Sequence, residues 1–306
     1  MEIVEYGGWK RNVRLANGKI ELVATLEVGP RVIHLAPRRG KNLFKNYDEQ
    51  MGRTGEGKWQ NRGGHRLWIA PEDPVATYFP DNGPVEVEEL PGGGVRLRPG
   101  PETPNGIQKE MAIRLDGEAA HVRVVHRLKN VGTETKRLAP WALSVMAPGG
   151  VAIIPLPARG EHPRNLLPNQ RLVLWPYTDL GDKRLAMHTR SVLLAQKRGA
   201  GPIKLGLSNP EGWAAYAVGG RLFVKRFAWN AEAEYPDMGS STELFTNSDM
   251  LEVESLGPMV ALEPGAAVEH VEDWHLFEDV PAPADGKDVE EHIRPLVEKT
   301  SNAVTK

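Results

Sequence analysis

Two glutamates at alternate positions, Glu252 and Glu254, are the clearest candidates for acid–base chemistry in this chain of 306 residues. They lie in the run Met250–Ser255, where they alternate with Leu251 and Val253. In a β-strand, residues two positions apart point to the same face, so the two carboxylates lie close together. Like charges at such a distance raise the pKa of one carboxyl toward the range of a general base. A solvated polar face of an antiparallel sheet is the alternative interpretation of the same pattern.

A second concentration of chemically useful side chains lies in the stretch Trp59–Trp68, on both sides of a Gly-Gly pair. Glycine lets the backbone approach a ligand closely. Fixed cationic donors beside an indole face suit a polyhydroxylated ligand such as a sugar. We therefore predict His65 as a catalytic residue and Arg62, Arg66 and Trp68 as substrate-binding residues. The alternative is that the arginines are surface charges and the tryptophans belong to the core.

Three further residues are predicted to bind substrate. Trp141, in the apolar run 138–150, and Trp175, just before a polar turn, could each stack on a sugar ring or belong to the core. Asp237 lies in the acidic cluster Glu234–Gly239, which leads toward the two glutamates in the sequence.

Several kinds of site are excluded by residue types. The chain has 0 cysteines, which excludes disulfides, thiolate nucleophiles, cysteine-ligated zinc and iron–sulfur clusters. None of the 9 histidines forms an H-x-H or H-x-x-x-H pair, and no calcium-loop pattern is present. The sequence therefore predicts neither a metal nor another cofactor.

The charge and hydrophobicity of the chain limit the classes of partner that it is expected to bind. The net charge is -2 and no block of lysine and arginine is present, so a nucleic-acid partner is not expected. The uncharged run 138–158 is long enough to cross a bilayer, but its four prolines predict buried strands joined by turns. The N-terminus has neither a basic start nor an apolar segment, which predicts a cytoplasmic protein, or a periplasmic one if a leader has been removed. A small-molecule carbohydrate is the expected partner, with no membrane.

Secondary-structure signals predict an all-β chain. The 32 glycines and 25 prolines are spread evenly, and many short runs alternate polar and apolar residues. One segment, from Asp285 to Val304, has helical spacing. We therefore predict one large antiparallel β-domain over residues 1–280 and a short C-terminal helical segment or tail over residues 281–306.

Short motifs in a defined order over residues 15 to 277 give a more specific signal: Leu15–Leu22, Gly29–Ile33, Lys41–Phe44, Arg62–His65, His126–Gly132, Met250–Glu254 and Leu262–Gly265. Their order resembles that of the galactose mutarotase-like superfamily, which includes aldose 1-epimerases and hexose-6-phosphate epimerases. The strings G-G-H-R-L-W-x-A-P-E, P-W-A-L-S and L-E-V-E-S-L-G-P are similar to an uncharacterised bacterial branch of it. The resemblance implies a large antiparallel β-supersandwich.

The resemblance also implies a mechanism. Aldose 1-epimerases use a glutamate as the base on the anomeric hydroxyl and a histidine as the acid on the ring oxygen. Glu252 matches the glutamate, Arg62 the substrate-binding arginine and His65 the first histidine loop. The second histidine should precede the mid-chain glycine-rich turn, but Pro140–Ser144 contains none. We expect an aldose 1-epimerase-like enzyme acting by Glu/His acid–base chemistry, with a non-catalytic carbohydrate-binding protein, or a sugar lyase or hydrolase on the same fold, as alternatives.

Overall fold

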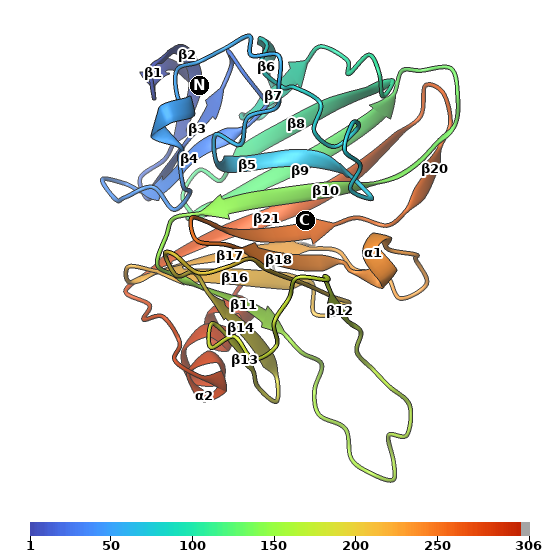
Figure 1. The fold of residues 1–306 in the computed structure, drawn as a ribbon. Helices are drawn as coiled ribbons and strands as arrows, with labels where there is room; N and C mark the ends of the chain where they lie inside the picture. The colour runs from blue at the N-terminus through green and yellow to red at the C-terminus, as the bar shows by residue number, and fades with distance from the viewer. Residues whose placement is uncertain (301–306) are drawn as a thin grey trace.

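Two large antiparallel sheets pack face to face in the computed structural model, which describes residues 1–300 (Figure 1). The larger sheet has 11 strands. Its strands, in spatial order, are β1 (Glu2–Tyr6), β2 (Trp9–Ala16), β3 (Ile20–Thr25), β4 (Val32–Pro37), β5 (Gly64–Ala70), β10 (Lys136–Met146), β19 (Leu251–Leu256), β18 (Thr242–Thr246), β15 (Ile203–Leu207) and β12 (Leu172–Leu174), with β20 (Val260–Leu262) paired to β10.

The second sheet has 10 strands. Its order is β13 (Leu185–Met187), β14 (Ser191–Ala195), β11 (Val151–Pro155), β16 (Trp213–Val218), β17 (Arg221–Phe227), β21 (Ala267–Glu278), β9 (His121–Asn130), β8 (Ile107–Leu115), β7 (Val95–Pro99) and β6 (Val85–Glu89). The all-β fold class predicted from the sequence is therefore confirmed, and the run 138–158 forms parts of β10 and β11 with a turn between them.

Alternation along the strands separates the core from the outer faces. In β9, buried residues such as Val122 and Val124 alternate with the partly exposed Arg123 and Val125. The buried set packs against the facing sheet, and removing apolar surface from water contributes about 25 cal/mol per Å². The outer face of the larger sheet carries a separate apolar cluster on its central strands, which includes Trp68, Trp141 and Leu143.

Helical structure is confined to short segments. A 3₁₀ turn, η1 (Asp48–Gln50), and a short helical turn, α1 (Pro236–Gly239), lie in loops. The C-terminal segment comprises α2 (Gly286–Asp288), the π-helical η2 (Val289–Ile293) and α3 (Arg294–Glu298). No helix within residues 1–300 has the length and apolar character that crossing a bilayer requires.

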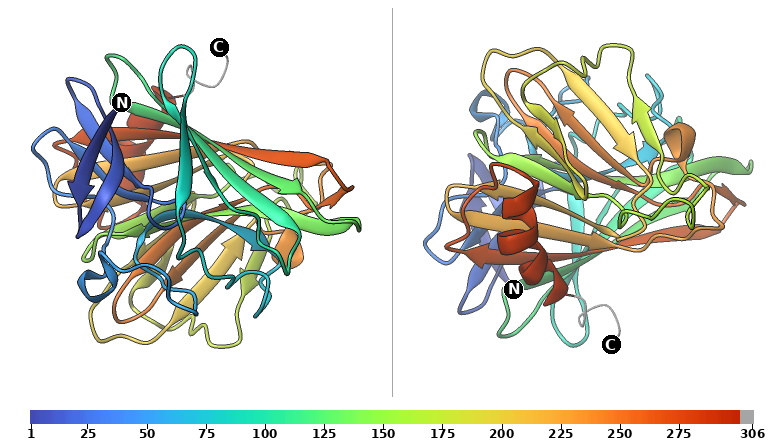
Figure 2. Two further views of the ribbon diagram at one scale, coloured as in Figure 1. Left: turned by 90° about the horizontal axis from the view of Figure 1, so that it is seen from above. Right: turned by 90° about the horizontal axis from the view of Figure 1, so that it is seen from below.

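The C-terminal helical segment packs on the outer face of the second sheet (Figure 2). Val289, Ile293 and Val297 are buried there in one cluster with Trp213 and Val224. The last part of the predicted helical segment, 301–304, lies outside the described residues. The proposed division into residues 1–280 and 281–306 stays a prediction.

Candidate functional site

A cavity of about 420 Å³ opens on the outer face of the larger sheet, a size within the usual range of small-molecule sites. Its floor comes from the central strands: Arg66, Trp68, Trp141, Leu143, Lys204, Phe245 and Glu252. Its rim comes from loops: Trp59, Asn61, Glu72, Tyr78, Tyr177, Pro202, Asn247 and Met250. We call this cavity the cleft.

Strand register explains why these floor residues meet. Arg66 on β5 is paired with Leu143 on β10, Leu143 with Glu254 on β19, and Glu254 with Glu243 on β18. Directly paired residues of neighbouring strands point to the same face of a sheet. The row therefore places one arginine and two glutamates on the outer face, in line across four strands.

A second row lies two residues along the same strands. Val145 on β10 is paired with Glu252 on β19, Glu252 with Phe245 on β18, and Phe245 with Lys204 on β15. Glu252 and Glu254 thus share the outer face, as their alternation in the sequence predicts. Lys204 joins them from a strand almost fifty residues earlier in the chain.

Arg66 and Glu252 form an ion pair in the floor of the cleft. Arg66 Nη2 donates to Glu252 Oε1 at 2.8 Å, and the two side chains are only 3% and 7% exposed. The guanidinium carbon of Arg66 lies 4.3 Å from the ring centroid of Trp68, in a cation–π arrangement. Arg66 Nε and Nη1 are buried and have no hydrogen-bond partner. Arg66 thus orients the Glu252 carboxylate and retains donors that a ligand could use.

Lys204 and two carboxyls form a second charged group, at the other side of the cleft. Lys204 Nζ lies 2.9 Å from Glu243 Oε2 and 3.9 Å from Glu254 Oε2. Trp141 Nε1 donates to the same Glu254 oxygen at 2.7 Å. Burial alone would lower the pKa of Lys204, but the negative charges of Glu254 and Glu243 raise it above its ordinary value.

The two carboxyls keep their protons to a higher pH than exposed glutamates do. Burial raises the pKa of Glu254 to about 7, although the Lys204 charge acts to lower it. Burial also raises the pKa of Glu243 well above its usual range. Because these carboxyls face each other across β18 and β19, they favour holding a proton between them near neutral pH.

The raised pKa of Glu254 predicts a pH-dependent stability difference. A carboxyl whose pKa rises from 4.5 to about 7 on folding contributes stability fully below its unfolded pKa and loses it as pH rises through the folded value. Glu254→Gln cannot ionise, so its free energy of unfolding should rise relative to wild type as pH increases from about 5 to about 8. Urea unfolding of both proteins across this range measures the difference. A difference independent of pH would contradict the raised pKa.

The other predicted substrate-binding residues lie at different distances from the cleft. Trp68 and Trp141 line it, and Glu254, which does not line it, accepts a hydrogen bond from Trp141 Nε1. Trp175 lies beside it, with its ring centroid 4.5 Å from Lys204 Nζ. Asp237, half-buried in α1, does not line the cleft, but its charge contributes to the raised pKa of Glu243.

Arg62 lies away from the cleft. It is fully buried, and its guanidinium donates to Glu56 Oε2 at 2.7 Å, Asn82 Oδ1 at 2.9 Å and the Gln50 carbonyl oxygen at 2.6 Å. Its φ of 54° lies in the left-handed region, next to Gly63 at 83°. The Gly-Gly turn therefore packs loops together around the arginine side chain, and Arg66 is the arginine that lines the cleft.

His65 also lies away from Glu252, on the opposite face of the larger sheet. It precedes Arg66 on β5, and neighbouring strand residues point to opposite faces. Its Nδ1 lies 2.8 Å from Ser144 Oγ and its Nε2 lies 2.7 Å from His126 Nε2. Burial lowers the pKa of His65 well below its usual value, which favours the neutral form of the ring. The structure thus brings Glu252 and Glu254 together but separates them from His65.

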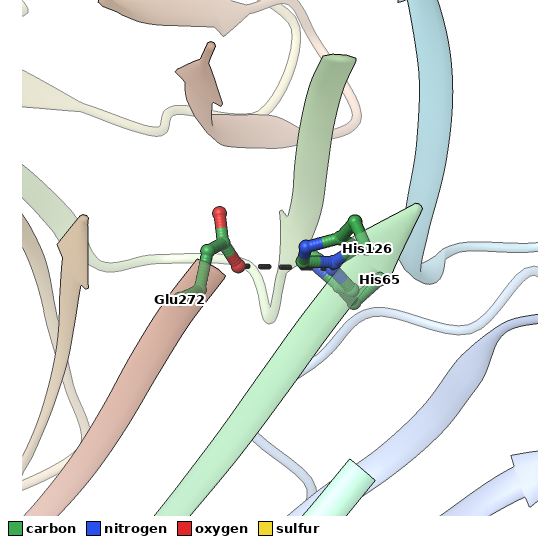
Figure 3. Close-up of side chains that lie close together, drawn as sticks. All are labelled: His65, His126 and Glu272. Atoms are coloured by element: carbon green, nitrogen blue, oxygen red, sulfur yellow. Dashed lines mark hydrogen bonds and ion pairs between the residues drawn. The ribbon is translucent and has the colours of Figure 1, made fainter. Parts of the chain in front are cut away.

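His65, His126 and Glu272 have ligand atoms within 4.8 Å of one another, which is the spacing of a candidate metal site (Figure 3). Lys225 Nζ already lies 2.9 Å from Glu272 Oε1, and it donates to the carbonyl oxygen of Val253 at 3.1 Å. Burial would raise the pKa of Glu272, but the Lys225 charge and the histidines lower it. Lys225 therefore supplies the positive charge of this buried network, and a divalent cation would have to displace it.

Lys204 and Glu243 are the residues of the site that sequence reasoning missed. Each is the single charged residue within a short strand, in Ile-Lys-Leu-Gly-Leu and Thr-Glu-Leu-Phe-Thr respectively. A charged residue within an apolar strand is rarely buried without a partner, so this is the signal that could have identified them.

Comparisons with known proteins agree with this architecture. No protein-family model matches the chain. No curated protein sequence matches it either. Among solved structures, a galactose mutarotase-like protein from Lactobacillus casei ATCC 334 aligns with a TM-score of 0.59 and 13% identity, over 87% of this chain and 100% of the other. The chain has the galactose mutarotase-like fold.

Two further structures with this fold are described as proposed aldose 1-epimerases. The protein from Klebsiella pneumoniae has a TM-score of 0.53 and 10% identity, over 97% of this chain and 86% of its own. That from Escherichia coli K12 has a TM-score of 0.51 and 13% identity, over 87% and 99%. The galactose mutarotase-like fold expected from the order of the motifs is therefore confirmed.

Proposed function

We propose that this chain is a carbohydrate-active enzyme of the aldose 1-epimerase type, which binds a sugar or sugar derivative in the cleft. The main support for this proposal is the Glu252 carboxylate, which Arg66 holds at 2.8 Å in the floor of a cavity lined by aromatic residues. A general base must lie within hydrogen-bond reach of the proton that it removes, and a carboxylate in a fixed orientation at the wall of a cavity is accessible to a ligand bound there. The galactose mutarotase-like fold supports the carbohydrate class.

Unpaired polar atoms support a ligand rich in hydroxyl groups. Trp59 Nε1, Asn61 Oδ1 and two nitrogens of Arg66 are buried without a hydrogen-bond partner, and all three residues line the cleft. Buried polar groups are normally satisfied, so a group of unsatisfied donors and acceptors at one cavity favours a polar occupant. The indole faces of Trp68 and Trp141 would pack on the C–H face of a sugar ring.

The proposed chemistry assigns the base role to Glu252. It removes the proton of the anomeric hydroxyl as the bond between C1 and the ring oxygen breaks and a C1 carbonyl forms. The electron pair of the broken bond goes to the ring oxygen, which takes a proton from a general acid or from water and gives that proton up again when the ring closes. Rotation about the C1–C2 bond and closure of the ring from the other side give the opposite anomer, and Glu252 returns its proton. Arg66 holds the carboxylate in its orientation throughout.

A non-catalytic carbohydrate-binding protein is the second candidate. All nine histidines of the chain lie within residues 1–300, and none lines the cleft. The histidine acid implied by the resemblance is therefore missing from the cavity, which favours binding without turnover. The two candidates differ in one measurable property, the rate of exchange between anomers.

The test combines a binding panel with an exchange assay. Aldoses, uronates and sugar phosphates are first compared by the melting temperature of the protein, since a ligand that binds only the folded state raises it. Sugars that raise it are then examined by NMR exchange spectroscopy for interconversion of their α and β anomers. Faster exchange than in buffer supports the enzyme, binding without faster exchange supports the second candidate, and no binding across the panel contradicts both.

Tryptophan fluorescence should report occupation of the cleft. Because Trp68 and Trp141 line it, a bound sugar should change their emission. Trp141→Phe should reduce the ligand-induced change, whereas Trp213→Phe, which alters a tryptophan in the cluster beneath the C-terminal segment, should leave it unaltered. Equal changes in the two variants would contradict ligand binding beside Trp141.

A further inference from the structure

Lys204 and Glu252 lie on the two sides of Phe245 in one row across the floor of the cleft. Lys204 is paired with Phe245, and Phe245 with Glu252, so the three residues occupy neighbouring strands β15, β18 and β19. Strands lie about 4.8 Å apart, which separates the outer two backbones by roughly 10 Å. Both side chains line the cavity together with Phe245, the residue that is paired with both of them. A ligand the size of one sugar ring can contact both at once.

The ammonium group of Lys204 has donors to spare. It carries three N–H bonds, and within residues 1–300 Glu243 Oε2, at 2.9 Å, is its one acceptor inside hydrogen-bond distance. The nearest oxygens of Glu254 and Glu72 lie at 3.9 Å. The indole rings of Trp141 and Trp175, each with its centroid 4.5 Å away, cover other sides of the group. The charged group is therefore held in place without being saturated by the protein.

We infer that Lys204 is the second catalytic residue of the cleft and donates a proton to the ring oxygen of the sugar. This inference rests on the proposed function and supplies the acid that no histidine provides. It is drawn from the position of Lys204 opposite Glu252 and from its free N–H groups.

The proton balance of the step is complete. Glu252 takes the proton of the anomeric hydroxyl as the bond from C1 to the ring oxygen breaks, and the electron pair of that bond goes to the ring oxygen. A proton from Lys204 forms the new hydroxyl there, which leaves a neutral amine. When the ring closes, the hydroxyl returns its proton to Lys204 and Glu252 returns its own to the anomeric oxygen.

Glu243 and Glu254 act through Lys204 as positioning residues. The negative charge that the two carboxyls share keeps the lysine charged before the reaction, and the ion pair with Glu243 at 2.9 Å holds the ammonium group in place. Glu254 is held by Trp141, so the indole that would stack on the sugar also orients this carboxyl.

The test compares Lys204→Met with Lys109→Met. Lys109 is a matched control because it is also buried, 6% exposed against 4% for Lys204, and pairs with Glu102 at 2.6 Å outside the cleft. With a sugar from the panel as the probe, Lys204→Met should lower kcat for anomer exchange about 10²- to 10⁴-fold, the usual contribution of a positioned acid or base. The dissociation constant should change much less, and Lys109→Met should retain wild-type kcat. Wild-type kcat in Lys204→Met would overturn the inference.

A second variant separates catalysis from folding. Lys204→Met leaves two buried carboxyls without a counter-charge, whereas Lys204→Met/Glu243→Gln removes one charge of each sign. The double variant should keep a wild-type circular dichroism spectrum and bind the sugar, yet show the same loss of kcat. Exchange at wild-type rate in this folded variant would also overturn the inference.

Failure of the proposed function has a different signature. If no sugar is exchanged by the wild-type protein, the enzyme proposal itself fails. If Glu252→Gln loses activity while both Lys204 variants keep it, the proposed function stands and the proton comes from another group. Measurements on the wild type, Glu252→Gln and the two Lys204 variants therefore show which of the two proposals fails.

Discussion

Glu252→Gln should lower the rate of anomer exchange about 10²- to 10⁴-fold while the protein remains folded. The amide cannot accept the proton of the anomeric hydroxyl as a carboxylate does. Its oxygen can still accept the hydrogen bond from Arg66 Nη2, now at 2.8 Å from the carboxylate, so the cavity keeps its shape. The lost charge pairing should cost about 1–3 kcal/mol of unfolding free energy. NMR exchange spectroscopy and urea unfolding measure the two effects.

Glu102→Gln is the matched control for this substitution. Glu102 is as buried as Glu252 and pairs with Lys109 at 2.6 Å, but it does not line the cleft. The two variants should lose similar stability, and only Glu252→Gln should lose turnover. Wild-type exchange rates in Glu252→Gln would exclude this carboxylate as the base.

Lys225→Met should cause the largest loss of stability, about 3–5 kcal/mol, the usual cost of removing one partner of a buried ion pair. Lys225 is fully buried between the sheets, and its ammonium lies 2.9 Å from Glu272. The substitution leaves an ionised carboxylate without its cation in surroundings that water does not reach. Urea unfolding at neutral pH measures the loss.

Removing the partner charge should recover part of that stability. In Lys225→Met/Glu272→Gln the buried position carries no charge, and the single amide oxygen can still accept from Trp274 Nε1, now 2.7 Å from Glu272 Oε2. The double variant should therefore be more stable than Lys225→Met alone. A double variant that is less stable than the single one would show that Glu272 contributes mainly through its hydrogen bonds with Ser255 and Trp274.

Local sequence pattern predicted the parts of the site that depend on neighbouring residues. Alternation is a property of a single strand, so the shared face of Glu252 and Glu254 could be deduced without knowing which strands lie beside them. The same rule places His65 and Arg66 on opposite faces of β5. From the sequence, both residues were predicted to belong to one site because they lie together beside the Gly-Gly pair. Composition alone could not distinguish the cleft residue Arg66 from the buried Arg62.

The rest of the site depends on strand order, which the sequence does not contain. Lys204 meets Glu254 only because β18 lies between β15 and β19 in the sheet. His65, His126 and Glu272 come from three strands of two different sheets, so no spacing motif could connect them. Contacts of this kind depend on the register between strands that are far apart in the sequence. A motif search detects only patterns among residues that are close together in the sequence.

Strand β10 contributes to both charged networks, and this restricts how the protein can diverge. Trp141 holds Glu254 on one face, Ser144 contacts His65 on the other, and the Ala142 carbonyl oxygen lies 3.4 Å from Lys225 Nζ. Substitutions along this strand should therefore show strong epistasis, because a change that suits a new ligand also disturbs the sheet interface. Ligand preference should evolve more freely at the rim, where Tyr177 and Asn247 lie in loops. Libraries aimed at new substrates should randomise those rim positions and leave β10 intact.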